Sequence, residues 1–559
     1  MADAETVARS GWRAFEPLRE RTYRNIWSAS LLSNFGQLIL GVGAAWEMTR
    51  LTAGSPRGPE MVALVQSALM LPLMLIAVPS GAIADMLDRR KVALTGLGFA
   101  SLCGVLLTVL AFAGMTTPWL ILAFCSLIGA GVALYGPAWQ ASVSEQVSAE
   151  HLPAAIALSS ISYNIARSVG PAIGGLIVVA AGAVAAFAVN AVFYLPLLTA
   201  FFFWQRRHVP PRLPPERIDR AIISGARYSI HSPSIKTVMI RAFTFSMAGS
   251  SVAALTPLLA KDQLKGDAST YGLLLGAYGV GAVAGALFTS DIRERFKGET
   301  SVCICALATG LMVLVIGLSH HLLISAAAMA VAGAAWMLLF SLLNVGVQLS
   351  SPRWVTARAL SWYQASLTGG VAIGAWMWGK AAAQWGVSDA FLVSGAAVAL
   401  LPLLGLLLPM PAVSLGAAEM VDLGKEPEVE LALTARSGPV VIEVDYRVDP
   451  ARARDFYDAV RKLQRVRLRN GGFNWSIARD IADPSLWTER YQCPTWGDYL
   501  RQRARLTQAD MELQEKAQSF QMAGEERRVR RRLERPFGSV RWSADTPDPH
   551  SDSINILTP

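Results

Sequence analysis

The sequence predicts an all-α membrane protein with twelve membrane-spanning helices in two six-helix bundles, followed by a small α+β domain. Of the 559 residues, 53% are hydrophobic and only 16% are charged, with a mean hydropathy of +0.38, whereas soluble domains carry about 25% charged residues. Apolar runs of about 20 residues, long enough to cross a bilayer, recur as far as residue 409. From Gly438 onward the pattern changes to the short strands and amphipathic helices of a soluble domain.

Twelve hydrophobic runs define the predicted spans, with boundaries that sequence patterns locate only to within a few residues. A polar stretch at 205–236 separates the first six spans from the last six. The spans cover residues 24–49, 60–84, 92–114, 118–142, 152–180, 183–204, 237–260, 270–290, 301–319, 321–349, 355–383 and 387–409.

Loops on one side of these spans carry most of the positive charge, which predicts the orientation. Loops rich in Lys and Arg stay on the cytoplasmic side, and an even number of spans puts both termini there. We therefore expect a multi-pass membrane protein with both termini in the cytoplasm. These loops and the tail explain the net charge of +9, so nucleic-acid binding need not be invoked. The cations on this side include Arg13, Arg19, Arg21, Arg24, Arg89, Arg90, Lys91, Arg293, Arg295, Lys297, Arg353 and Arg358.

The chain divides into six predicted segments. The first linker begins with prolines that keep it extended. Its second part, Glu216 to His231, alternates isoleucines with arginines, which predicts an amphipathic helix on the membrane surface; a plain tether is the alternative. The segments are a six-helix bundle over 1–204, a cytoplasmic linker over 205–236, a second bundle over 237–415, a linker over 416–437, a ferredoxin-like cytoplasmic domain over 438–535 and a disordered tail over 536–559.

A charged turn between the second and third spans is the most specific motif of the chain. Gly81 allows close helix approach, Asp85 lies where one helix ends, and Arg89 and Arg90 begin the next. The spacing resembles the signature loop of the major facilitator superfamily, with Asp88 in place of its second glycine, as in the drug- and siderophore-exporter branch. The alternative is that the arginines only set topology.

That resemblance implies a secondary transporter that works by alternating access. Gly81, Asp85, Arg89 and Arg90 are then expected to control the cytoplasmic gate. Glu145, near the end of the fourth span, is expected to form an ion pair with Arg89 across this gate.

The two halves also repeat each other in sequence. Residues Gln146–Ser159 align without gaps with Gln348–Ser361, and Gly174 and Gly374 follow at nearly the same offset. Weak symmetry between six-span halves is typical of major facilitator transporters.

Polar residues in the first span are candidates for the transport pathway, because each costs free energy unless it faces a cavity or a partner. Asn34 and Gln37 share a helix face and are expected to line the cavity. Glu47 lies near the outer end and precedes Arg50. It is either an interfacial acid paired with that arginine or a proton acceptor.

The fifth span carries a second motif, Gly170-Pro171 followed by Gly174-Gly175. It resembles the antiporter motif of facilitator exporters, although packing alone would also explain the small residues. Asn164 and Arg167 share a face of this span. Arg167 lies about 24 Å along the helix from His151 at ~1.5 Å per residue, which allows either a central binding role or an arginine directed toward the outer leaflet.

The second half offers a less specific set of polar and aromatic candidates. Among them, Gln348, Tyr363 and Gln364 are expected to line the substrate or proton pathway. Because the sequence contains no Gly-rich phosphate loop with Lys-Ser/Thr, ATP is not expected as the energy source. The full set is Arg241, Trp336, Asn344, Gln348, Tyr363, Gln364, Trp376, Trp378 and Lys380.

The tail is predicted to follow a β-α-β-β-α-β order, with strands near 440–447, 473–481, 486–492 and 528–533 and helices from Asp449 to about Arg469 and from Trp496 to about Phe520. It resembles small dimeric α/β barrels of the antibiotic-biosynthesis monooxygenase type. It is also similar to the tail of the transmembrane secretion effectors, the branch with enterobactin-exporter-like proteins. The matching segments are Glu443–Tyr446, Arg465–Gly472 and Asp480–Pro484.

These resemblances imply an exporter of a small organic molecule, siderophore-like or drug-like, coupled to protons. They also imply dimerisation or regulation as the role of the tail. We expect no enzyme activity, no cofactor and no metal, since the five cysteines lie mostly inside apolar runs without metal-ligand spacing. The alternative is a membrane-anchored sensor or enzyme whose working part is the tail domain. Composition and motifs do not identify the substrate.

Overall fold

The computed structural model describes residues 16–148, 150–205, 218–288, 298–352, 354–410, 419–421, 427–431, 433–522, 524–525 and 527–534. The chain forms two compact units. One comprises 1–222, 237–345 and 360–410, and the other comprises 223–236, 346–359 and 411–559. The predicted disordered tail at 536–559 lies outside the described residues.

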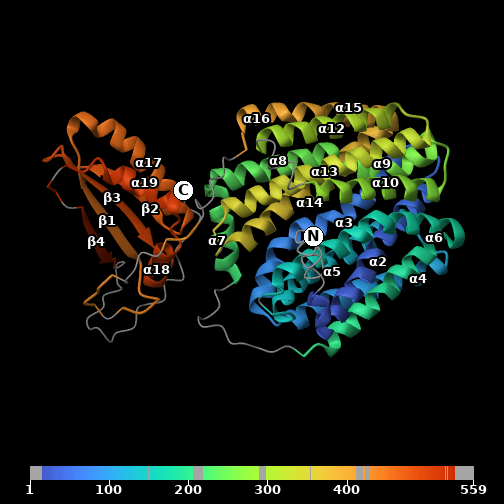
Figure 1. Cartoon of the computed structure of the whole chain (residues 1–559), viewed down its shortest axis with the longest axis horizontal. Coiled ribbons are helices and arrows are strands. Elements are labelled where there is room, and N and C mark those ends of the chain that lie inside the picture. The colour runs from blue at the N-terminus through green and yellow to red at the C-terminus, as the bar shows by residue number, and fades with distance from the viewer. Residues whose placement is uncertain are drawn as a thin grey trace, which may run out of the picture. The chain divides into compact units, whose positions relative to one another are not determined.

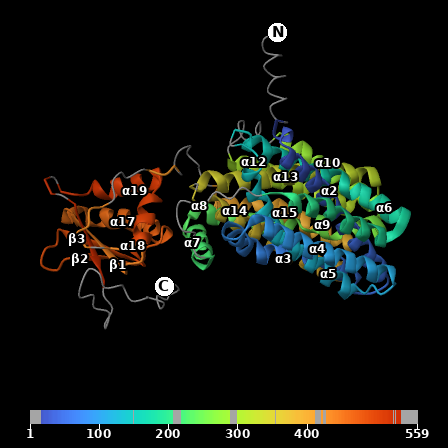
Figure 2. The ribbon, with the colours of Figure 1, turned by 90° about the horizontal axis from the view of Figure 1, so that it is seen from below.

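Long helices that run side by side build the first unit (Figures 1 and 2). Helices of the first half are coloured blue to green, and those of the second half green to orange. The first half comprises α2 (Arg21–Leu51), α3 (Gly58–Met86), α4 (Arg89–Phe112), α5 (Pro118–Ser142) and α6 (Leu152–Phe203). The second half comprises α8 (Pro233–Gly249), α9 (Ser251–Leu258), α10 (Ala268–Leu287), α12 (Gly298–Leu318), α13 (Leu322–Ser350), α14 (Thr356–Trp385), α15 (Val387–Leu400) and α16 (Leu404–Leu407).

The helix lengths account for twelve membrane spans. Within the described ranges, nine helical segments are long and apolar enough to cross a membrane. One of them, Ala154–Phe203, has 50 residues and makes two crossings, because α6 bends at Gly182, where φ is 77°. Helices α2 and α14, with 31 and 30 residues, are also long enough to cross a membrane, although they are more polar than the nine segments. Together with the double crossing of α6, they bring the number of crossings by described helices to twelve. The predicted fold class is therefore confirmed.

Equivalent helices of the two halves pack in equivalent ways. A Cβ atom on Gly174 of α6 would lie 3.2 Å from the Ile39 Cα of α2. Gly374 of α14, its counterpart in the sequence repeat, lies against the Met247 carbonyl oxygen of α8 in the same manner. The internal repeat therefore corresponds to a repeated helix–helix contact.

A four-stranded antiparallel sheet with three helices forms most of the second unit (Figure 1). The strand order is β2-β3-β1-β4, as in a ferredoxin-like unit. The predicted order of elements is confirmed, but the single helix expected from Trp496 to Phe520 is two helices. A capping box between Thr507 and Asp510 starts the second one. The elements are β1 (Val440–Arg447), α17 (Ala453–Arg469), β2 (Phe473–Arg479), β3 (Leu486–Cys493), α18 (Trp496–Ala504), α19 (Gln508–Gln518) and β4 (Arg528–Leu533).

A buried ion pair lies inside this domain. Arg467 Nε and Nη2 donate to the two carboxylate oxygens of Glu489 at 3.1 and 3.3 Å, and Trp475 Nε1 donates to the same carboxylate at 3.0 Å. Burial alone would lower the pKa of Arg467, but the adjacent Glu489 carboxylate outweighs it and raises that pKa well above its usual value. The guanidinium therefore stays charged in the core.

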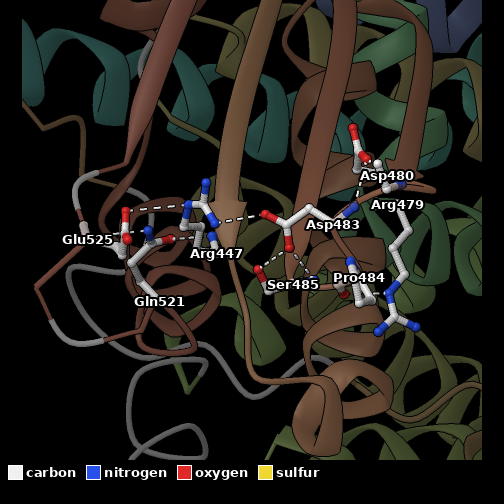
Figure 3. A network of polar contacts seen from close by, with 9 residues as sticks. Arg447, Arg479, Asp480, Asp483, Pro484, Ser485, Gln521 and Glu525 are labelled. Atoms are coloured by element: carbon white, nitrogen blue, oxygen red, sulfur yellow. Dashed lines mark hydrogen bonds and ion pairs between the residues drawn. The ribbon is translucent and has the colours of Figure 1, made fainter.

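The turn between β2 and β3 is fixed by a polar network (Figure 3). Asp480 Oδ1 accepts hydrogen bonds from the backbone N–H groups of Ala482 and Asp483 at 2.8 and 2.9 Å. The Ser485 hydroxyl and Arg447 Nη1 donate to the Asp483 carboxylate at 2.6 and 2.8 Å. The Ser485 hydroxyl bond, followed by its backbone N–H, the Arg447 charge and the Arg447 hydrogen bond, lowers the pKa of Asp483. The Asp480–Pro484 sequence match therefore corresponds to a turn held by hydrogen bonds and an ion pair.

Within the second unit, the linker helix α7 (Ile218–His231) contacts residues from distant parts of the chain. The Tyr228 ring, which is buried, lies edge-on to Trp354, with ring centroids 5.3 Å apart. The guanidinium of Arg469 lies 5.1 Å from the Tyr228 ring, and that of Arg505 lies 3.9 Å from the Trp354 ring. These cation–π contacts tie α7 to the sheet domain of the same unit.

We predict that Glu489→Gln destabilises the C-terminal domain by about 3–5 kcal/mol, because it leaves the buried Arg467 charge without a counter-ion. Hydrogen exchange of β1 and β3 amides in the full-length protein measures this change. The control is Glu534→Gln, which removes a pair with Arg490 whose side chains are 47% and 39% exposed; it should change stability by only about 0–1 kcal/mol. Equal effects of the two substitutions would contradict the prediction.

Candidate functional site

The connection between α3 and α4 consists of two residues, Leu87 and Asp88. Asp88 Oδ1 accepts the backbone N–H groups of Arg90 and Lys91 at 2.9 and 3.3 Å. It therefore caps the first turn of α4, where a carboxylate also interacts favourably with the helix dipole. This explains why an aspartate can replace the glycine of the signature loop.

The predicted ion pair between Arg89 and Glu145 is present. Arg89 Nη1 donates to Glu145 Oε1 at 3.0 Å and to the Ala141 carbonyl oxygen at 2.7 Å. Glu145 belongs to the 3₁₀ turn that follows α5, so both partners lie in the first half. The pair therefore connects two elements of one half and does not bridge the two halves.

Arg90 binds the end of α6. Its Nε donates to the Phe201 carbonyl oxygen at 2.9 Å, and its Nη2 donates to the Phe202 carbonyl oxygen. These carbonyls belong to the last turn of a helix, where no further N–H is available along the chain. Arg89 and Arg90 thus connect α4 to both α5 and α6. We call this end of the bundle the Arg89 end. The Asp85 side chain lies outside the described residues.

Two seams join the halves, and the first lies between α6 and α10. A Cβ atom on Gly175 would lie 2.5 Å from the Ala268 carbonyl oxygen and 3.0 Å from the Gly272 Cα. The Ser168 hydroxyl donates to the Gly279 carbonyl oxygen at 3.1 Å. The small residues of the Gly-Pro motif therefore bring two backbones into direct contact. Gly170 and Gly174 of the same motif face α2 instead.

The second seam lies between α3 and α14. The Ser67 hydroxyl donates to the Ala372 carbonyl oxygen at 2.6 Å. A Cβ atom on Gly379 would lie 2.5 Å from the Ala63 Cβ. Toward the Arg89 end the seam is looser, because a Cβ on Gly81 would meet only the Ser361 hydroxyl at 3.5 Å, an ordinary contact distance.

Arg167 lies beside the first seam. Its guanidinium is 5.8 Å from the ring of Tyr278 on α10, so it contacts the other half of the protein. Within the described ranges, no carboxylate pairs with this half-buried arginine. Asn164, on the same face of α6, is half-buried, and Asn34 Nδ2 donates to the Ser162 hydroxyl at 3.4 Å. The predicted polar residues of α2 and α6 are thus on neighbouring helices.

Glu47 is paired at the opposite end of the bundle. Arg50 Nε and Nη2 donate to its two carboxylate oxygens at 2.9 and 2.6 Å. The Glu47 side chain is 10% exposed, whereas that of Arg50 is 68% exposed. The carboxylate is therefore paired with the arginine that follows it in the sequence, and it is nearly shielded from solvent. Gln37 is half-buried on the same helix.

The second-half candidates occupy different environments. The Tyr363 hydroxyl is buried and donates to the Phe340 carbonyl oxygen at 2.9 Å, whereas Gln348 and Gln364 are exposed. Arg241 is completely buried and donates to both carboxylate oxygens of Glu299, at 2.6 and 2.7 Å. Sequence analysis missed this pairing because the two residues lie on α8 and α12, far apart in the sequence.

In the part of the chain that the structure describes, no group of three or more His, Cys, Asp or Glu residues could hold a metal ion.

A groove of about 640 Å³ lies between α4 and α6, lined by apolar side chains such as Val109, Phe112 and Val184. Since it is confined to the first half and carries no charge, it suits lipid chains better than a transported solute.

Two six-span halves that meet along two small-residue seams, with an arginine beside one of them, define a transporter of the major facilitator fold. A profile of the family described as transmembrane secretion effector matches residues 12–537. The chain belongs to this family, and the resemblance noted in the sequence is confirmed. It is therefore a multi-pass membrane protein and a secondary transporter that exports small molecules.

Similar proteins include the enterobactin exporters EntS of Escherichia coli O1:K1 / APEC and Shigella boydii serotype 18. Each is 25% identical over 365 residues, covering 63% of this chain and 83% of the relative. Among solved structures, the POT family transporter PepTSo has a TM-score of 0.58 and 12% identity, covering 69% of this chain and 97% of its own. A D-xylose–proton symporter has a TM-score of 0.53 and 13% identity, covering 68% and 96%. The two structures support the fold.

We predict that Gly175→Val forces α6 and α10 apart, because the added side chain would overlap the Ala268 backbone. The expected destabilisation is about 1–3 kcal/mol, together with loss of transport. The control is Gly98→Val on α4, where nothing lies within 4 Å of an added Cβ atom. Thermal unfolding of the purified protein and a transport assay measure both effects. Normal activity of Gly175→Val would exclude a tight seam at this position.

Proposed function

We propose that this chain moves a small organic molecule, siderophore-like or drug-like, out of the cytoplasm across the bacterial inner membrane by alternating access, with protons as the coupling ion. In this proposal the Arg89 end and both termini face the cytoplasm, because the positive charge of the loops is concentrated there. The enterobactin exporters among its relatives favour a siderophore-like substrate.

The observation that carries the proposal is the position of Arg167. Within the described ranges it has no carboxylate partner and lies beside the seam between the halves, next to Tyr278. A cation inside a membrane protein is costly unless it faces a partner or a water-filled cavity. A bound anionic or phenolic substrate, supported by Asn34, Gln37 and Asn164, would supply that partner.

The seams favour a state that is closed at the end of the bundle opposite Arg89. There Gly175 contacts Ala268, and Lys261 Nζ donates to the Thr49 carbonyl oxygen at 3.2 Å, so both halves are bonded to each other. At the Arg89 end the halves are packed less tightly, because a Cβ atom on Gly81 would meet only the Ser361 hydroxyl, at an ordinary contact distance. We propose that transport alternates between closing one end and closing the other, with Gly81, Asp85, Arg89, Arg90 and Glu145 controlling the cytoplasmic end.

Glu47 is the proposed proton carrier. Its carboxylate is nearly buried and is held by the exposed Arg50. Binding of a proton would remove the negative charge that attracts Arg50 and so change the contacts at that end of α2. Gln348, Tyr363 and Gln364 are the corresponding proposals for the second half.

The test is export of labelled catecholate and drug-like compounds from proteoliposomes, with and without a proton gradient. We expect gradient-dependent export of one compound class. Glu47→Gln should abolish gradient-driven transport but retain substrate exchange at zero gradient, because exchange needs no net proton movement. Asp389→Asn, which alters an exposed acid of α15, is the control. Unchanged gradient-driven transport in Glu47→Gln would assign proton coupling to another group.

A separate prediction concerns Arg89 and Glu145. If their pair stiffens the first half, Glu145→Gln should lower the turnover number several-fold while leaving substrate affinity unchanged. The partly exposed pair is worth only about 0–1 kcal/mol in stability, so the folded protein should persist. A double-mutant cycle with Arg89→Gln measures the coupling, and the double variant should be no slower than either single variant. Additive losses would show that the two residues act independently.

For the C-terminal domain we propose regulation or dimerisation as its role, with no catalytic activity. The alternative, a membrane-anchored enzyme or sensor whose working part is this domain, predicts that the isolated domain turns over a substrate or binds a ligand. The transporter proposal predicts instead that a folded chain cut after about residue 415 still moves solute.

A further inference from the structure

The C-terminal domain contains a cavity of about 80 Å³ between its sheet and the helices α18 and α19. On the sheet side it is lined by side chains of β1 and β4, including Ile442 and Val444, and on the helix side by the end of α18. A water molecule needs roughly 10–15 Å³ of such space, so the cavity has room for about six waters. That volume fits a ring-sized molecule.

Positive charge is concentrated on its walls. Arg467 lines the cavity, but its charge is neutralised by Glu489. Arg503, Arg527 and Arg531 also line it, and among the described residues none of these three forms an ion pair with a carboxylate. Within the described ranges the cavity therefore carries three guanidinium groups that no carboxylate neutralises, although Arg531 is an exposed residue. Such groups favour an anion, and arginine binds carboxylates through two parallel hydrogen bonds.

Polar groups that could orient a ligand lie beside these charges. The Tyr499 hydroxyl accepts a hydrogen bond from Arg531 Nε at 2.7 Å. Gln502, almost fully buried, lines the same wall, where its amide accepts from Cys493 Sγ and donates to the Arg467 carbonyl oxygen, both at 3.4 Å. The Arg531 guanidinium is thus held in place by Tyr499 and not by an acid, which leaves its remaining N–H groups to other acceptors.

The opposite wall is apolar. Ile442 and Val444 of β1 are buried, Val529 of β4 lies beside them, and Leu506 closes the cavity from the α18–α19 connection. An inorganic anion would leave this wall in contact with water only. A ligand with a charged end and an apolar body would satisfy both walls.

We propose that the C-terminal domain binds a small organic carboxylate with an apolar, ring-sized body in this cavity. The carboxylate would lie against Arg503, Arg527 and Arg531, and the ring against Ile442 and Val444. This proposal does not depend on the transport function proposed above, because none of its residues belongs to the membrane-spanning helices.

The experiment measures binding of radiolabelled benzoate to the purified full-length protein by equilibrium dialysis. We expect saturable binding of one benzoate per chain and none of benzamide, its neutral isostere. Arg503→Ala and Arg527→Ala should each weaken binding at least about tenfold, or 1.4 kcal/mol. Arg461→Ala, which removes an exposed arginine of α17, should leave binding unchanged.

Three outcomes would overturn the proposal. The first is no saturable binding up to roughly 10 mM benzoate by protein whose C-terminal amides show normal hydrogen-exchange protection. The second is equal binding of benzamide, which would mean that charge plays no part. The third is loss of binding in Arg167→Ala with retention in Arg503→Ala, which would place the ligand in the membrane bundle. Hydrogen exchange of each variant also shows whether the domain has folded.

Discussion

Close approach of helix backbones is the constraint on which the membrane bundle depends. In lipid, helices gain little by burying apolar side chains against one another, so their association relies on van der Waals contact and interhelical hydrogen bonds. Gly175 against Ala268 and Ser168 on the Gly279 carbonyl supply both at one seam. The Ser67 bond to the Ala372 carbonyl does the same at the other. The position of Arg167 between the halves follows from this packing.

The sequence predicted the spans, the order of strands in the tail and the Arg89–Glu145 pair, because each depends on hydrophobic period, turn residues or a family motif. It did not predict which partners distant residues would choose. Arg241 was recognised as a polar residue in a span, but its pairing with Glu299 depends on how α8 and α12 pack. The break between α18 and α19 was missed because the Thr507–Asp510 capping box lies inside a stretch of continuous helix propensity.

The arginines fall into two groups with different energetics. Arg89, Arg90 and Arg241 donate to carboxylates or to carbonyls at helix ends, so their charges hold helices in position. In the described residues, Arg167 and the cavity arginines such as Arg503 have no such acid. The first group is explained by the fold. The second group has unused hydrogen-bonding capacity, which is the physical reason for assigning ligands to it.

The two-residue connection between α3 and α4 has a mechanical consequence. With Asp88 bonded into the first turn of α4 and only Leu87 besides it, the two helices have no slack to hinge against each other. Arg89 and Arg90 fasten the same corner to α5 and α6. Short connections and hydrogen bonds therefore join α3, α4, α5 and α6 at this corner. We expect the movement that solute passage requires to occur along the seams between the two halves.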